Sequence, residues 1–335
     1  MTAPIVTLTM NPALDVVTSV DRVMPEHKLR CGPIRTWPGG GGVNVARAIR
    51  NLGGAASAVY PLGGLTGSAY QRLATTTGID GHVIRINGET RECFTVDEVG
   101  TGGQYRFVLP GPTLSDAEWE ACISVVADHV PHGGYLVASG SLPPGVPEDF
   151  YGRLARICAG ENARLVVDTA GAPLRAALDE GVFLIKPSRS ELAHLVGAEH
   201  DLDPDDHLEA VSEIVRSGHA EIVALTLGAA GALVVSKDGV LRLPAPEVAV
   251  LSAVGAGDAF LAALVLRLAQ GTSLSDAFRT AVAAGTATSM RPGTELCTLG
   301  DVVALEDLLV PSAIPVGPRT VTDGAASAVS VVRPA

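Results

Sequence analysis

Lysine is scarce in this sequence: three occur among the 335 residues, and none of them follows a glycine. A Walker A phosphate-binding loop needs a Gly-Lys pair, so this type of loop is excluded. The glycine run Gly39–Gly42 does not meet the dinucleotide fingerprint, because Asn44 and Val45 stand where its third glycine would be. The H-E-x-x-H and G-x-S-x-G motifs are also missing, which leaves metalloprotease and α/β-hydrolase functions without their local signatures.

Cysteines are few and scattered, and long apolar runs are missing. The five cysteines form no C-x-x-C pair, which argues against a disulfide framework or a structural zinc site and fits a reducing cytoplasm. The first residues show no basic stretch followed by an apolar run, and no segment reaches the roughly 18 uninterrupted apolar residues of a membrane span. We therefore expect a cytoplasmic protein without a membrane partner.

Basic residues are outnumbered, 24 to 36, by acidic ones, and the formal net charge is -12. Such a field repels nucleic acid and anionic membranes, so neither is expected as a partner. An anionic ligand must then be held by a local cluster of basic side chains.

Short apolar runs alternate with segments of helical periodicity along most of the chain. This alternation predicts an α/β fold with a mostly parallel central sheet that helices cover on both faces. The expected strands lie in "PIVTLTM", "AASAVYPLGG", "GGYLVASGS", "ARLVVDTA", "GVFLIKPS", "EIVALTLG" and "GALVVSKDGV", and expected helices lie in "GVNVARAIRNL", "SDAEWEACISVVADHV", "EDFYGRLARICAG" and "SRSELAHLVG".

Two segments interrupt this alternation, residues 15–37 and residues 91–111. We predict that their strands, at about 15–37 and 91–108, form one small antiparallel sheet that lies over the main domain as a lid. The main domain is expected to span residues 1–310. The remainder, residues 311–335, is rich in Pro, Ala, Ser and Val without helical periodicity and is expected to be a loosely attached tail.

A second glycine-rich turn, "AVGAGDAF", opens an apolar helix and places Asp258 in its first turn. A carboxylate there can cap the helix, because it accepts from free backbone N–H groups. Gly255 and Gly257 leave the backbone bare enough for close approach by a ligand, and a helix N-terminus attracts anions. The sequence of this turn alone does not decide whether Asp258 caps the helix or lies beside a bound ligand.

Together, these segments resemble the PfkB (ribokinase-like) family of sugar kinases. "PGGGGVNVARAIRNLGG" and "AVGAGDAF" are similar to the two family signatures, and "GQYRFVLPG", "SGSLPPG", "LIKPSRSEL" and "LTLGAAGAL" occur in the family's order. The resemblance runs from about residue 5 to about residue 310 and implies a ribokinase-like three-layer domain with a β-sheet lid. "LTMNPALD", "EHKLRC" and "TRECFTV" most resemble its ATP-dependent 6-phosphofructokinases, which make fructose 1,6-bisphosphate from fructose 6-phosphate.

The resemblance implies that Asp258 is the general base, which accepts the proton of a sugar hydroxyl as that oxygen attacks the γ-phosphate of ATP. The backbone N–H groups around Gly255, Ala256 and Gly257 would face the charge that develops on the transferred phosphoryl group. The carboxylate touches different groups in these two roles, so the cap and the base can be told apart by its contacts.

The family pattern also implies which residues hold the sugar. Asp15 and Asn44 would bond sugar hydroxyls, Gly40 and Gly41 would line the sugar, and Ser141 would add a hydrogen bond. Four cations on the two expected lid segments would hold a sugar phosphate, which favours a phosphorylated substrate over a free sugar or nucleoside. These cations are Lys28, Arg30, Arg91 and Arg106.

On the nucleotide side, Lys186 resembles the family's contact to the ATP phosphates. Thr226, Gly228 and Gly231 resemble the loop that holds the nucleotide. The sequence departs from the family where magnesium is handled: Ser188 stands in the position of an Asn, while Glu191 is kept and would bind Mg²⁺ through water. Activity is expected to persist, with an altered magnesium requirement.

The resemblance also implies a monovalent cation site and a homodimer, and it leaves alternative functions open. Ser252, Val254 and Gly293 match part of a monovalent cation site, where K⁺ would bind, but Glu295 replaces a basic residue. The lid implies a homodimer. Within the kinase reading, 1-phosphofructokinase and tagatose-6-phosphate kinase stay open as alternatives, and an adenosine or ribose kinase is disfavoured by the cations. A sugar-phosphate-binding regulator with weak turnover is the alternative from another class.

Overall fold

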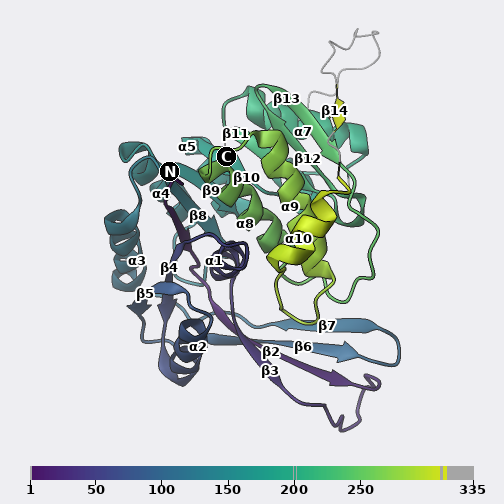
Figure 1. Cartoon of the computed structure of the whole chain (residues 1–335). Helices are drawn as coiled ribbons and strands as arrows, with labels where there is room; N and C mark the ends of the chain where they lie inside the picture. Colours follow the sequence, from purple (N-terminus) through teal and green to yellow (C-terminus); the bar gives the residue numbers. More distant parts are fainter. Residues whose placement is uncertain (1, 199, 201, 310–311, 315–335) are drawn as a thin grey trace.

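The computed structural model describes residues 2–198, 200, 202–309 and 312–314 and places them in a large body with a small projecting sheet (Figure 1). In this part of the chain the body contains a ten-stranded sheet in the order β14-β13-β12-β11-β10-β9-β8-β1-β4-β5. The strands are β1 (Ile5–Leu8), β4 (Ser57–Leu62), β5 (Asp80–Arg85), β8 (Tyr135–Ser139), β9 (Arg164–Asp168), β10 (Val182–Ile185), β11 (Ala220–Thr226), β12 (Ala232–Ser236), β13 (Gly239–Leu243) and β14 (Ser312–Ile314).

In the part of the sheet from β5 to β11, neighbouring strands pair in parallel. Beyond β11, the strands β12, β13 and β14 each pair antiparallel with the strand before them. All residues of β1 and β8 are buried, as expected for central parallel strands covered on both faces. The predicted α/β fold with a mostly parallel sheet is therefore confirmed. Because parallel strands all end at one edge of the sheet, the polar residues that follow β8, β9 and β10 meet there.

Helices cover both faces of the sheet, and alternate residues of each strand pack against opposite layers. Val137 and Val166 pack with the core of one layer, while Leu136 and Val167 pack with the other. The first layer contains α1 (Gly41–Asn51), α2 (Gly64–Thr76), α8 (Ala256–Ala269), α9 (Leu274–Ser289) and α10 (Leu299–Glu306); the second contains α3 (Asp116–His129), α4 (Phe150–Gly160), α5 (Gly171–Glu180), α6 (Arg189–Leu195) and α7 (Pro204–Arg216).

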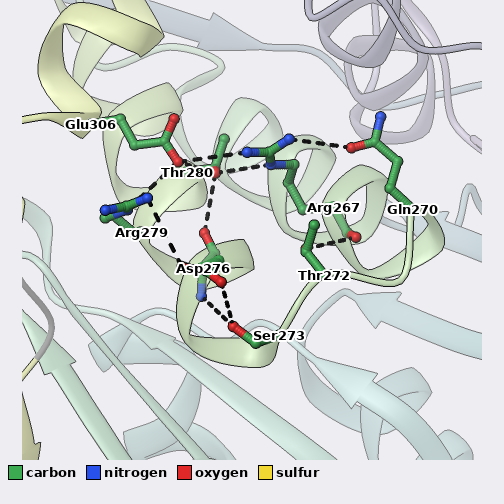
Figure 2. Close-up of polar contacts among 8 residues, drawn as sticks. All are labelled: Arg267, Gln270, Thr272, Ser273, Asp276, Arg279, Thr280 and Glu306. Atoms are coloured by element: carbon green, nitrogen blue, oxygen red, sulfur yellow. Dashed lines mark hydrogen bonds and ion pairs between the residues drawn. The ribbon is translucent and has the colours of Figure 1, made fainter.

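A polar cluster ties the last turn of α8 to α9 and α10 (Figure 2). Glu306 of α10 accepts from the hydroxyl of Thr280 (2.6 Å) and forms ion pairs with Arg279 (3.6 Å) and Arg267 (3.9 Å). Arg267 also donates to Thr280 from its Nε (3.2 Å). Two cations and a hydroxyl around one largely buried carboxylate satisfy its charge, so this end of α8 is held in a fixed position.

Four strands project together from the body as the lid, in the order β3-β2-β6-β7 (Figure 1). They are β2 (Ala13–Val20), β3 (Arg35–Gly39), β6 (Arg91–Glu98) and β7 (Gly103–Val108). The prediction of a lid from two inserted segments is confirmed, but the expected all-antiparallel pairing is wrong. Each segment folds back on itself as an antiparallel pair, whereas β2 and β6 both start at the body, run outward side by side and pair in parallel.

The end of the main sheet includes a short part of the expected tail. Residues 312–314 form β14, which pairs with β13 through Ala313 opposite Leu241. The rest of the expected tail, residues 315–335, lies outside the described residues. Within the described ranges, no helix has both the length and the apolar character that crossing a membrane requires.

Candidate active site

Three neighbouring strands end in polar residues that lie against one another. β8 ends in Ser139, β9 ends in Asp168, and Lys186 follows β10 directly. Lys186 Nζ lies 3.0 Å from Asp168 Oδ1, and the Ser139 hydroxyl donates to Asp168 Oδ2 (3.1 Å). Burial favours the neutral amine, but Asp168, with smaller effects of Glu191 and other carboxylates, raises the pKa of Lys186 above its ordinary value. A fixed cation therefore lies at the carboxyl edge of the sheet.

The helix α8 begins beside this edge. Gly255 precedes it with a φ of 78°, in the left-handed region that glycine adopts without steric cost. An added Cβ at Gly257 would lie 3.4 Å from Lys186 Nζ, which places the amine next to the first turn of α8. The positive end of the helix dipole and the ammonium group thus lie together, where both favour an anion.

Asp258 does not act as the cap of α8. Its Oδ2 accepts a hydrogen bond from Asn44 Nδ2 of α1 (2.9 Å), a residue 214 positions away in the chain. Burial, and then the negative charge of Asp168, raise the pKa of Asp258 to about 6; Asn44 and Lys186 act in the opposite direction. The carboxylate is therefore held by a neutral donor and has a pKa suited to a base near neutral pH.

Two cavities, of about 760 and 750 Å³, meet at the start of α8. Gly255 and Asp258 line the first cavity, whereas Ala256 and Gly257 line the second. Of the sequence-predicted sugar residues, seven line the first cavity: Asp15, Gly40, Gly41, Asn44, Arg91, Arg106 and Ser141. Of the predicted nucleotide residues, four line the second: Ser188, Thr226, Gly228 and Gly231.

The first cavity contains a second carboxylate, Asp15 of β2. Burial raises the pKa of Asp15 to about 6, although Arg47, Arg106 and Arg91 act in the opposite direction. Arg91 is held in place because its guanidinium donates to the backbone carbonyls of Leu109 (2.9 Å) and of Asn11 (2.8 Å). The cavity therefore combines the carboxylates of Asp15 and Asp258 with two arginines from the lid.

Within a single chain, the four cations that were predicted to bind a sugar phosphate do not form one cluster. Arg91 and Arg106 line the first cavity, on β6 and β7. Lys28 and Arg30 are exposed on the segment that joins β2 to β3, and neither lines either cavity. The four-cation cluster that was expected on the lid is thus reduced to two arginines in one chain, because the β2–β3 connection carries the other two away from the cavity.

The second cavity is formed by a loop between β11 and β12 on one side and by α8 and α9 on the other. Thr226 is fixed at the end of β11 because its N–H donates to the carbonyl of Pro187 (3.0 Å). Gly231 has a φ of 93°, and a Cβ there would lie 2.0 Å from the carbonyl oxygen of Leu243. Glycine is therefore required for the turn that shapes this cavity.

Ser188 and Glu191 form a reciprocal capping box at the start of α6. The Ser188 hydroxyl accepts from Glu191 N–H (3.3 Å), and Glu191 Oε2 accepts from Ser188 N–H (2.7 Å). Glu191 also lines the first cavity, while Ser188 lines the second. A carboxylate has two oxygens and about four acceptor positions, so the cap leaves Glu191 able to bond a hydrated cation.

The residues expected to bind a monovalent cation lie around the start of α8. Ser252 is buried, and its hydroxyl accepts from Val254 N–H (3.2 Å). Gly293 packs close to Val17 of the lid. Glu295, the residue that departs from the family, forms an ion pair with Arg35 (3.8 Å).

Two buried charged residues of this region were not singled out from the sequence. Asp168 ends the apolar run "ARLVVD", and a carboxylate directly after a buried strand was a signal that could have identified it. Arg47 is 8% exposed on α1, and a cation on the buried face of an amphipathic helix is the corresponding signal. Both lie within the electrostatic reach of Asp258.

Comparisons with known proteins agree with this geometry. The chain is 46% identical over 298 residues to the ATP-dependent 6-phosphofructokinase isozyme 2 of Mycobacterium tuberculosis, covering 89% of this chain and 87% of that protein. Its structure superimposes on phosphofructokinase-2 from Escherichia coli in complex with potassium (TM-score 0.88) and with fructose-6-phosphate (TM-score 0.86), each 39% identical and covering 91% of this chain and 99% of the other. The profile of the pfkB family carbohydrate kinases matches residues 4–299, and the chain belongs to this family.

Proposed function

We propose that this chain is an ATP-dependent 6-phosphofructokinase, which transfers the γ-phosphoryl group of ATP to the 1-hydroxyl of fructose 6-phosphate and releases ADP and fructose 1,6-bisphosphate. The observation that carries this proposal is the position of the α8 N-terminus between two cavities. A sugar in the first and a nucleotide in the second would face each other across Gly255 and Asp258. The relatives named above support fructose 6-phosphate as the acceptor.

Asp258 acts as the general base in this proposal. Its Oδ2 is held by Asn44, so the carboxylate is oriented before the sugar binds. The 1-hydroxyl of the sugar loses its proton to Asp258 as its oxygen attacks the γ-phosphorus. The first-turn N–H groups of α8 lie where the two cavities meet and stabilise the charge on the transferred group. Lys186 lines neither cavity in this structure, but its ammonium lies beside Gly257 of the same turn and adds positive charge there.

The sugar phosphate is held by the lid arginines. Arg106 lines the first cavity, and its positive charge lowers the pKa values of both Asp258 and Asp15. It therefore lies within electrostatic reach of both carboxylates. Arg91 lies on the neighbouring strand, fixed by two backbone carbonyls, and offers a pre-oriented guanidinium to the 6-phosphate.

Magnesium and a monovalent cation are the expected metal partners. Glu191 would hold Mg²⁺ through water, and Ser188 keeps its capping role, so its replacement of Asn leaves α6 intact. Bound Mg²⁺ would neutralise the charge of the ATP phosphates. K⁺ would bind near Ser252, Val254 and Gly293, which lie beside the start of α8.

A second copy of the chain is proposed to cover the lid. Phe94, Phe107 and Val108 line the first cavity and remain 37%, 52% and 64% exposed. Apolar side chains at the mouth of a polar cavity favour a partner that removes them from water. Such a dimer is also the arrangement in which the exposed Lys28 and Arg30 can take part in binding.

The proposal is tested by measuring ADP release from purified protein with ATP and magnesium. Fructose 6-phosphate is expected to be preferred over fructose 1-phosphate, tagatose 6-phosphate, fructose, ribose and adenosine. Loss of the base in Asp258→Asn should lower kcat by about 10²- to 10⁴-fold, while Asp238→Asn, at an exposed turn, should leave it unchanged. Tight binding of one sugar phosphate without turnover would instead indicate a regulator.

Turnover should depend on pH through Asp258. Because the pKa of Asp258 is raised to about 6, the carboxyl becomes protonated as the pH falls through that value and can no longer accept a proton. We expect kcat/KM for fructose 6-phosphate to be constant near neutral pH and to decline below about pH 6. A pH-rate profile that stayed flat down to pH 5 would contradict this assignment.

Removal of the Arg106 guanidinium should weaken binding of the phosphorylated sugar. A charge-assisted hydrogen bond contributes about 1.5–3 kcal/mol, so Arg106→Met should raise KM for fructose 6-phosphate by about tenfold to a hundredfold. The turnover of unphosphorylated fructose should change much less. Arg72→Met, an exposed position on α2, is the matched control. Equal losses with both sugars would argue against a phosphate contact.

The oligomeric state tests the role of the lid. Light scattering at micromolar concentration should give the mass of a dimer, and Phe107→Glu should shift it towards the monomer because a charge would be buried in the interface. Monomeric wild-type protein under these conditions would rule out the lid dimer.

A further inference from the structure

Arg47 is a buried cation that the mechanism above does not use. It lies on α1, where residues 42 to 49 are all buried, and its Nη1 donates to two acceptors. These are the backbone carbonyl of Pro38 on β3 (3.3 Å) and Oδ1 of Asn44 on the same helix (3.1 Å). Because a buried charge is costly without partners, these bonds account for how the residue is tolerated. Asn44 bonds both Arg47 and Asp258, so Arg47 is linked to the proposed base through a single side chain.

The Asn44 amide is held at both of its ends. Nδ2 donates to Asp258, and Oδ1 accepts from Arg47. A guanidinium can only donate, so it fixes the oxygen end of the amide on its own side. The opposite orientation would place Oδ1 against the Asp258 carboxylate and the amide N–H groups against a cation. Arg47 thus selects the orientation that gives Asp258 a donor.

The titratable groups around Arg47 come from three different elements. Burial lowers the pKa of Arg47, whereas Tyr70 of α2, Asp15 of β2 and Asp258 of α8 act to raise it. Arg47 in turn favours the ionised form of Asp15. The guanidinium therefore interacts with both Asp15 and Asp258, although it does not itself line the first cavity.

Several other groups also act on the pKa of Asp258, and they would remain if Arg47 were removed. Asp168 at the end of β9 disfavours the ionised carboxylate, while Lys186 after β10 and Arg106 on β7 favour it. Asn44 on α1 favours it through the hydrogen bond. Loss of Arg47 would leave these charges in place but free the amide to turn, so its effect should be transmitted mainly through Asn44.

We propose that Arg47 is a positioning residue, which holds the Asn44 amide in the orientation that presents its N–H group to Asp258. The bond to Pro38 connects this arrangement to the end of the lid strand β3, directly before α1. The inference rests on the proposed function, because it requires Asp258 to be the base. A competing account makes Arg47 only a clamp between α1 and β3, and the two accounts differ in what its removal does to pH dependence.

The test measures kcat, KM, the pH profile of kcat/KM and thermal stability for three variants. Arg47→Met should lower kcat by about tenfold to a hundredfold, as misplacement of a reacting group does, and should move the acidic limb to higher pH. Arg47→Lys keeps a cationic donor and should restore part of kcat and of the pH profile. Arg50→Met is the matched control: Arg50 is exposed on the same helix, bonds Gly78 O, and should leave all kinetic values unchanged.

A double variant tests whether Arg47 acts through Asn44. In an Asn44→Ala background, Arg47→Met should cause little further loss of kcat and no further shift of the acidic limb. Fully additive losses would overturn the inference, as would an Arg47→Met enzyme of lowered stability with the wild-type kcat and pH profile. If Arg47→Met does not fold, Arg47→Lys carries the same comparison. Absence of wild-type turnover with every sugar phosphate would instead overturn the proposed function itself, and this inference with it.

Discussion

The hydrogen bond between Asn44 and Asp258 connects the two glycine-rich helix starts on which the site depends. Gly40 precedes α1 and Gly255 precedes α8, and each turn requires a positive φ. The bond is possible only because the two helices lie in the same layer, packed against one face of the sheet. The position of the Asp258 carboxylate beside the first cavity depends on this contact between distant parts of the chain.

The position of α8 is fixed by more than this bond. Nine of its residues are buried, and its last turn is held by the charged cluster around Glu306 (Figure 2). A helix that is anchored at its far end and buried along its length cannot move its first turn without repacking the core. The N–H groups and the carboxylate that serve the reaction are therefore carried by a rigid element, as a preorganised site requires.

An acidic protein that binds two anionic molecules must concentrate its positive charge. Here the α8 N-terminus and the lid arginines line the cavities, and the buried ammonium of Lys186 lies beside the first turn of α8, while many other charges are dispersed over the surface. The negative groups that share the site, Asp15 and Asp258, are partly buried beside the first cavity. Their raised pKa values are the direct consequence, and they place the ionisation of both groups close to neutral pH.

The sequence by itself determined the alternation of strands and helices, the two glycine turns and the lid segments. These features are local: periodicity reports which side of an element is buried, and glycine reports where a backbone must turn. Only the tertiary structure decided the parallel pairing of β2 with β6, the separation of Lys28 and Arg30 from the cavity, and the roles of Asp168 and Arg47. Each of these depends on which distant segments come into contact, and that is set by packing of the whole chain rather than by any local pattern.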